Sequence, residues 1–148
     1  MSTSDPNCMA CNVVAGRLVP PGGIIYEGEH WLVSHQVSPV LLRGFLIIKT
    51  RRHCEHLADL TDAEAAEFGP ILRDVSRALS DVVSPAKVYS CSFGEQVTHI
   101  HFYVIPRYPD LPASGLKTLD EIMRFKQHQC SDDEAAHIAA QVKARLKR

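Results

Sequence analysis

The sequence predicts an α+β fold: about five antiparallel strands, one long central helix packed on the sheet, and a second helix at the C-terminus. Three observations predict this class. Short β-rich runs occur in two groups, a long stretch between them carries apolar residues at helical spacing, and 148 residues suffice for one substantial core. We therefore expect a single domain over residues 1–148.

The composition is that of a soluble globular protein. Hydrophobic residues make up 45% of the chain, charged residues 22%, and the formal net charge is −1. A near-neutral chain has no general attraction to nucleic acid or anionic membranes. No run approaches the roughly 20 apolar residues of a membrane span, and MSTSDPNC lacks the features of a signal peptide. We expect a cytoplasmic protein that binds neither nucleic acid nor membrane.

The first half of the chain is expected to supply three strands. Residues 24–27 and 30–35 form a hairpin around a tight turn. The continuous apolar run at 44–50 is typical of a strand that is covered on both faces. The basic residues that end this run, Lys49, Arg51 and Arg52, could attract a polyphosphate, although a solvated strand end is the simpler interpretation.

The long helix is expected over residues 60–83. Thr61 and Glu64 form a capping box at its start, and apolar residues from Phe68 onward give one stripe at helical spacing. Pro70 is expected to kink this helix or delay its first turns.

Two more strands and a helix complete the chain. Residues 87–93 and 98–106 are expected to pair, and residues 110–148 to form an irregular segment followed by a helix capped by Ser131 and Glu134. A sheet this small leaves an edge or flank to cover, which favours a homodimer.

The strand VTHIHFYVIPR carries the most unusual pattern. Strand alternation would place His99, His101 and Tyr103 on one face, and Phe102 and Val104 on an apolar face under the helix. The alternative is an ordinary half-buried strand with a polar side. Such sides usually carry Thr, Lys, Glu or Ser, so two neighbouring imidazoles favour a functional site.

Histidines at this spacing suit two kinds of chemistry. They could bind a metal, or one could act as a nucleophile while the other orients it. A histidine that attacks phosphorus forms a phosphoramidate and splits one difficult displacement into two easier ones. This chemistry is typical of phosphoryl and nucleotidyl transfer.

Cys8 and Cys11 are the one recognisable pair among five cysteines. Their spacing is that of metal ligands. Incidental thiols or a redox pair are the alternatives, and the pair lacks the strand-helix context of a thioredoxin-like motif.

Residues 94–107, GEQVTHIHFYVIPR, resemble the histidine triad (HIT) signature, His-φ-His-φ-His-φ-φ with a preceding Gly-Gln pair and a following Pro-Arg. The resemblance runs in order over about residues 8–110. CMACNVVAGRLVP resembles the family's Cys-x-x-Cys opening, IIYEGEHWLVSHQ its first hairpin, and RGFLIIKTRRHCEHLADLT its third strand and the start of its helix. The resemblance implies a HIT-like fold with a zinc-binding N-terminal arm over residues 1–20.

The resemblance also implies roles for the motif residues. His101 would be the nucleophile that takes up a nucleoside monophosphate, and His99 would support it. Tyr103 stands where the family has its third histidine. With a pKa near 10, tyrosine donates a hydrogen bond but supplies no cation at pH 7, so turnover would be slower or redirected.

Four residues are candidate substrate contacts. Glu95 and Gln96 fill places near the phosphate, and because a carboxylate repels phosphate, Glu95 either points away or leaves the contact to Gln96. Arg107 could neutralise phosphate or form a surface ion pair. His35 could lie near the ribose or be an exposed residue at a strand end.

The resemblance to zinc-bearing members implies that His53 and His99 join Cys8 and Cys11, with His56 as the alternative third ligand. Four protein ligands would leave no open position, so the zinc would be structural.

Together these features imply an enzyme, a HIT-type nucleotidyl hydrolase or transferase similar to diadenosine polyphosphate hydrolases. It would cleave a phosphoanhydride or phosphoramidate at the α-phosphate of a purine dinucleoside polyphosphate or nucleoside phosphoramidate, through a covalent intermediate on His101. The first alternative is a zinc-stabilised nucleotide-binding or regulatory protein with weak or no catalysis. The second, zinc ligation by both histidines, leaves the rest of the signature unexplained.

Overall fold

Five antiparallel strands form one sheet, in the order β1-β2-β3-β5-β4, in a computed structural model that describes residues 4–112 and 114–147. The ends of the expected domain, residues 1–3 and 148, and Ala113 lie outside the described residues. The helices and strands in chain order are α1 (Met9–Val14), β1 (Ile24–Glu27), β2 (Trp31–His35), β3 (Leu46–Thr50), α2 (Asp62–Val83), β4 (Lys87–Cys91), β5 (His101–Arg107), α3 (Leu116–Arg124) and α4 (Asp132–Leu146), with 3-10 turns at Leu57–Asp59 and Lys126–His128. The expected α+β fold with a five-stranded antiparallel sheet and a long helix is confirmed.

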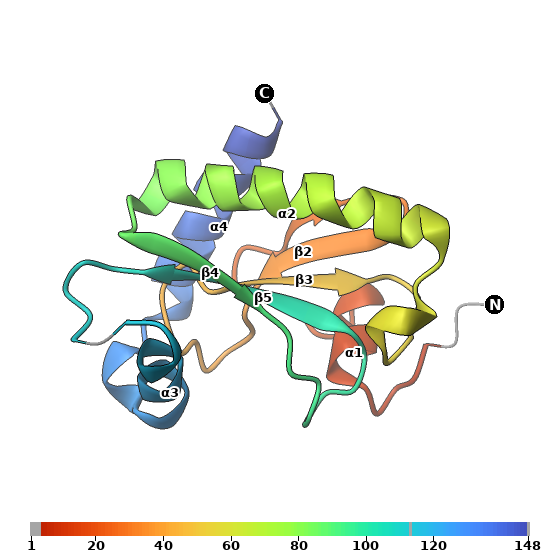
Figure 1. Ribbon diagram of the computed structural model, residues 1–148, viewed down its shortest axis with the longest axis horizontal. Helices are drawn as coiled ribbons and strands as arrows, with labels where there is room; N and C mark the ends of the chain where they lie inside the picture. The colour runs from red at the N-terminus through yellow and green to blue at the C-terminus, as the bar shows by residue number, and fades with distance from the viewer. Residues whose placement is uncertain (1–3, 113, 148) are drawn as a thin grey trace.

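Helices α2 and α4 cover one face of the sheet, and α1 and α3 lie on the other side (Figure 1). Under α2 and α4 the strands contribute a buried apolar cluster of Trp31, Val33, Leu46, Ile48 and Val104. The indole of Trp31 is fully buried, and its Nε1 donates a hydrogen bond to the backbone oxygen of Glu64 at 2.8 Å. This face holds the main core and fixes the sheet against α2.

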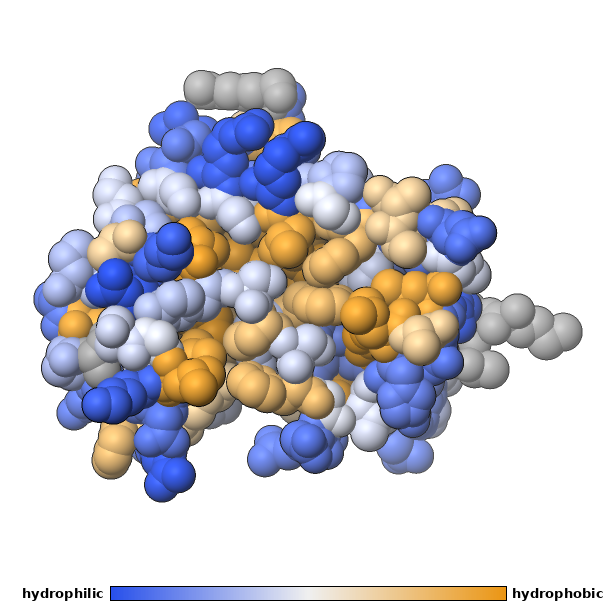
Figure 2. All heavy atoms as spheres, viewed as in Figure 1, coloured by the Kyte–Doolittle hydropathy of each residue, from blue (hydrophilic) through white to orange (hydrophobic). Residues whose placement is uncertain are grey.

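The opposite face divides into two parts. Toward α3 it is apolar, with Phe45, Ile105, Leu119 and Ile122 in a second buried cluster. Toward α1 it carries the polar side chains of the candidate site. In the view of Figure 2, apolar residues reach the surface across the middle of the molecule, with polar residues around them.

The capping box of Thr61 and Glu64 starts α2 as expected. Thr61 Oγ1 accepts from the Glu64 amide at 3.2 Å, and the Glu64 carboxylate accepts from the Thr61 amide at 2.8 Å. The expectation that Pro70 delays the helix is wrong, because α2 already begins at Asp62. The packing of Ile71 and Val75 in the core offsets the hydrogen bond that proline cannot donate.

Two helices lie where the sequence suggested none. In α1 the cap is the Cys8 sulfur, which accepts from the Cys11 amide at 3.4 Å, and in α3 the N-cap is Gly115 without a side-chain cap. Neither helix carries the Ser, Thr, Asp or Asn cap that marks a helix start in a sequence. The segment expected to be irregular after residue 110 therefore contains α3. Among the described residues, no helix is long and apolar enough to cross a membrane.

Candidate functional site

His99 and His101 serve two different sites. Strand β5 begins at His101, so the expectation of a strand from residue 98 is wrong. Both histidines still lie on the α1 side of the sheet, as the alternation predicted. The chain bends just before the strand, where the Ile100 amide donates to the backbone oxygen of Cys54 at 2.7 Å. His99 is thereby turned toward α1, and His101 faces a cavity next to it.

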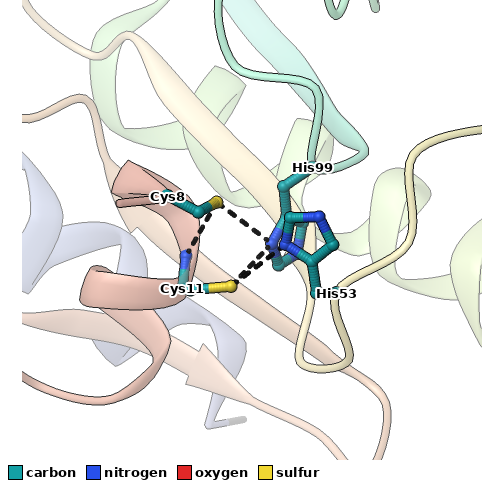
Figure 3. A group of neighbouring side chains, drawn as sticks. All are labelled: Cys8, Cys11, His53 and His99. Carbon is teal, nitrogen blue, oxygen red and sulfur yellow. Dashed lines mark hydrogen bonds between the residues drawn. The ribbon is translucent and has the colours of Figure 1, made fainter. Parts of the chain in front are cut away.

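His99 belongs to a cluster with Cys8, Cys11 and His53, and the ligand atoms of the four residues all lie within 4.8 Å of one another (Figure 3). The sulfurs of Cys8, at the N-cap of α1, and of Cys11, within α1, face the two imidazole rings. His99 Nδ1 lies 3.7 Å from Cys8 Sγ and 3.4 Å from Cys11 Sγ, and His53 Nδ1 lies 3.2 Å from Cys11 Sγ. Ligand atoms of a tetrahedral zinc site stand about 3.3–3.8 Å apart, since Zn–S is about 2.3 Å and Zn–N about 2.0 Å. The four residues therefore fit a tetrahedral metal ion.

The protonation of His99 also fits a metal ligand. Its Nε2 lies 2.8 Å from the backbone oxygen of Thr50, which can only accept, so Nε2 carries the proton. The Nδ1 lone pair is then free and points toward the two sulfurs. Burial lowers the pKa of His99 to about 4, which keeps the ring neutral. A backbone acceptor on the far nitrogen is the usual way in which a protein orients a metal-binding histidine.

The candidate nucleophile His101 has a defined tautomer as well. Its Nδ1 lies 2.8 Å from the backbone oxygen of His99 and must donate to it, which leaves the Nε2 lone pair unprotonated. Burial lowers the pKa of His101, so the ring is neutral near pH 7. A neutral imidazole with a free Nε2 is the form that attacks an electrophile.

His101 lines a cavity of about 340 Å³ on the α1 side of the sheet. Its apolar wall comes from α1 and the segments around β2 and β3. Its polar side chains come from Ser34, Gln36, Ser38, Lys49, Gln96, His101 and Tyr103, and the other lining residues are Met9, Ala10, Val13, Val37, Pro39, Leu41, Phe45, Ile47, Val97 and Met123. A mostly apolar cavity with a few converging polar groups is typical of a small-molecule site.

Tyr103 lies beside His101 in this cavity. Their ring centroids are 5.2 Å apart, and the tyrosine ring packs edge-on against Phe45 at 5.0 Å. Burial raises the pKa of its hydroxyl, so Tyr103 is a neutral hydrogen-bond donor at pH 7. Aromatic packing fixes the ring of Tyr103 next to the candidate nucleophile.

The sequence led us to overlook Lys49, for which a solvated strand end was the simpler interpretation. Lys49 is only 3% exposed, pairs in register with His101 across β3 and β5, and donates from Nζ to Ser34 Oγ at 2.9 Å. The other two basic residues of the group have structural partners: Arg51 binds Glu27 and Arg52 binds Glu64. The position of this lysine inside an otherwise apolar strand was the one feature of the sequence that could have indicated its burial.

Burial lowers the pKa of Lys49 from 10.5 to about 7, and this shift predicts a pH-dependent stability. The unfolded chain binds the proton more tightly between pH 7 and 10.5, so the free energy of unfolding rises with pH by at most about 1.4 kcal/mol per unit. The neighbouring titratable groups, His99 and His101, stay neutral over this range because their pKa values are lowered. Urea unfolding at pH 7 and pH 9 should show a gain about 2 kcal/mol larger in wild type than in Lys49→Met, whereas an equal gain would contradict the shift.

The expected substrate contacts separate into two groups. Gln96 lines the cavity, whereas Glu95 is exposed and does not. His35 is fully buried, with Nδ1 against the Gln36 oxygen and Nε2 accepting from the Gly44 amide, so it has no free ring nitrogen for a ribose. Arg107 lies at the far end of β5, six residues or about 20 Å from His101. The positions of Glu95, His35 and Arg107 give no support to a substrate contact.

The comparisons with known proteins agree with this geometry. A model of the HIT domain matches residues 17–110, which is more than half of the chain. Protein hit of Bacillus subtilis is 29% identical over 107 residues, 69% of this chain and 72% of that protein.

Solved structures resemble the fold over nearly its whole length. A Zn-bound histidine triad family protein from Mycobacterium smegmatis has a TM-score of 0.72 at 20% identity, over 95% of this chain and 94% of that chain. A hypothetical histidine triad nucleotide-binding protein from Sulfolobus tokodaii has a TM-score of 0.72 at 16% identity, over 95% of this chain and 92% of that chain. At these identities the likeness shows the fold alone, and the match of the family model over residues 17–110 shows that this chain belongs to the HIT domain family.

Proposed function

We propose that this protein is a nucleotidyl hydrolase or transferase in which His101 forms a covalent bond to a nucleoside monophosphate. The observation that carries the proposal is the unprotonated Nε2 of His101 in a cavity that also holds Lys49, Gln96 and Tyr103. The substrate class is a purine dinucleoside polyphosphate or a nucleoside phosphoramidate. The nucleotide-binding protein of Sulfolobus tokodaii, which has the same fold, supports a nucleotide as ligand.

The reaction has two displacements. His101 Nε2 attacks the α-phosphorus, and the bond from phosphorus to the leaving oxygen or nitrogen breaks. The Nδ1 proton stays on the ring, where the backbone oxygen of His99 accepts it and stabilises the positive charge that develops. Tyr103 can donate a hydrogen bond to the leaving group. Water then attacks the phosphorus and releases a proton to the solvent. The P–N bond to His101 breaks, its electron pair returns to Nε2, and the nucleoside monophosphate leaves.

A structural zinc is part of the proposal. Cys8, Cys11, His53 and His99 would hold it, and four protein ligands would leave no position for substrate. Bound zinc would link α1, which forms one wall of the cavity, to the segment that precedes His101. Its contribution is to position the groups around the nucleophile.

The alternative is a zinc-stabilised nucleotide-binding or regulatory protein with weak or no catalysis. It is favoured by Tyr103, which supplies no positive charge, and by the exposed carboxylate of Glu95 near the cavity.

A homodimer remains part of both proposals, since β1 and β4 are edge strands. Light scattering on the eluting protein would show twice 16.4 kDa for a dimer.

Intact-protein mass after mixing with a diadenosine polyphosphate, without an acid quench, tests the enzymatic proposal. The expected result is a mass gain equal to one adenylate, followed by its loss as water cleaves the adduct. Binding without adduct or hydrolysis would support the alternative. If neither adduct, hydrolysis nor binding occurs at millimolar ligand, both proposals fail.

Tyr103→His separates the two proposals by the size of its effect. A second imidazole next to His101 adds a group that can carry positive charge near the phosphate. The enzymatic proposal predicts a modest gain in turnover, about two- to fivefold, because the wild type already turns over. The alternative predicts a gain of more than about a hundredfold, within the range of general acid catalysis. Steady-state hydrolysis of the same dinucleotide by both proteins measures the factor.

A further inference from the structure

Lys49 is a buried lysine whose side chain has no carboxylate partner among the described residues. Among the described residues its Nζ donates one hydrogen bond, to Ser34 Oγ, whereas an ammonium can donate three. An unpaired buried charge costs several kcal/mol relative to water, so such a group persists where it has a use. The position of Lys49 therefore suggests an anionic ligand.

The location of Lys49 limits what that anion can contact. Lys49 and His101 occupy opposite places on the adjacent strands β3 and β5, and both side chains line the same cavity. Neighbouring strands lie about 4.8 Å apart, so one phosphate can reach both residues. The anion that would pair with Lys49 is the group that His101 would attack.

The cavity has no competing charge among the lining residues that the structure describes. They include no Asp or Glu and no second Lys or Arg. The aromatic ring beside His101 in the cavity belongs to Tyr103, which is neutral. Among the described lining residues, Lys49 is thus the one lysine or arginine that can pair with a phosphate in this cavity.

We propose that Lys49 contacts the α-phosphate of the nucleotide and provides the positive charge that Tyr103 cannot. The proposal rests on the proposed function and names a further catalytic residue for it. Lys49 donates to a non-bridging oxygen while His101 attacks the phosphorus, and Ser34 holds the ammonium in place. Positive charge fixed beside a transferring phosphoryl group stabilises its transition state and also holds the substrate.

The charge on the lysine responds to the ligand. In the free protein, burial lowers the pKa of Lys49 to about 7, and an adjacent phosphate anion favours the protonated form. The cost of an unpaired ammonium is therefore reduced in the free protein, and the full charge is restored when the anion binds.

Binding of AMP and of adenosine to Lys49→Met tests the contact, because the two ligands differ only in the phosphate. Methionine keeps the length and apolar stem of the side chain and removes the charge. We expect AMP affinity to fall about 10- to 100-fold, as for a lost charge-assisted hydrogen bond, and adenosine affinity to stay within twofold. Lys87→Met, on the exposed edge strand β4, is the matched control and should change neither affinity.

The outcomes separate this proposal from the proposed function. Unchanged AMP affinity, or an equal loss for AMP and adenosine, would overturn the role of Lys49 even if the wild type forms the adenylate adduct. Lys49-dependent binding of AMP without any adduct would support the phosphate contact and refute the hydrolase. If the wild type binds neither ligand, both proposals fail.

A second test asks whether Lys49 supplies the positive charge that a histidine at position 103 would supply. Tyr103→His should raise turnover by a larger factor in the Lys49→Met background than in the wild type, because it restores a cation to a cavity that has lost its own. A non-additive gain of about tenfold or more supports the proposal. Equal factors in the two backgrounds would overturn it.

Discussion

His101→Ala is expected to abolish the adenylate adduct and to lower turnover of a dinucleoside polyphosphate by at least about 10³-fold. Removal of a covalent nucleophile eliminates the two-step route, and losses of up to about 10⁶-fold are known for such residues. The structure gives the reason: His101 Nε2 is unprotonated and faces the cavity, while Nδ1 is engaged by the His99 backbone. Intact mass and steady-state hydrolysis measure the two effects.

The same variant should still fold and bind. His101 is part of the cavity lining and belongs to neither apolar cluster, so we expect AMP affinity within about tenfold of wild type and an unchanged circular dichroism spectrum. His137→Ala, an exposed histidine on α4, is the matched control and should keep full activity. A persistent adduct in His101→Ala, or turnover within tenfold of wild type, would contradict the assignment of the nucleophile.

Cys8→Ser is expected to lower the zinc content from about one ion per chain to near zero and to destabilise the fold by about 3 kcal/mol or more. A structural zinc contributes its binding free energy to folding, and loss of a metal is among the few changes that cost this much. The substitution keeps the N-cap of α1, because serine accepts the Cys11 amide at least as well as cysteine does. A loss of stability in this variant therefore reports the metal and not the cap.

Chelation provides the decisive comparison. A strong chelator should lower the urea midpoint of wild type to that of Cys8→Ser and leave the variant unchanged. Cys130→Ser, a partly exposed thiol outside the cluster, should keep both its zinc and its response to the chelator. Wild-type protein that is purified without zinc, and gains no stability when zinc is added, would refute the metal site.

Much of the fold was predictable from short-range patterns. The hairpin of β1 and β2, the capping box of Thr61 and Glu64, and the apolar stripe of α2 follow from residues within a few positions of one another. The pairing of Cys8 and Cys11 with His53 and His99 came from resemblance to a family, since no local pattern links residues so far apart. Helices α1 and α3 were missed because their caps are a cysteine and a glycine.

The sequence by itself determined the five strands and helices α2 and α4, together with a candidate histidine nucleophile and a candidate metal-binding cysteine pair. Only the tertiary structure decided where His99 and Lys49 lie. Alternation gives only the side of the sheet on which a side chain lies, and a bend before His101 turns His99 toward the cysteines. Lys49 lies beside His101 because β3 and β5 pair in that register, and α1 covers the cavity that both residues line. Both contacts join residues far apart in the sequence, so no local pattern of residues encodes them.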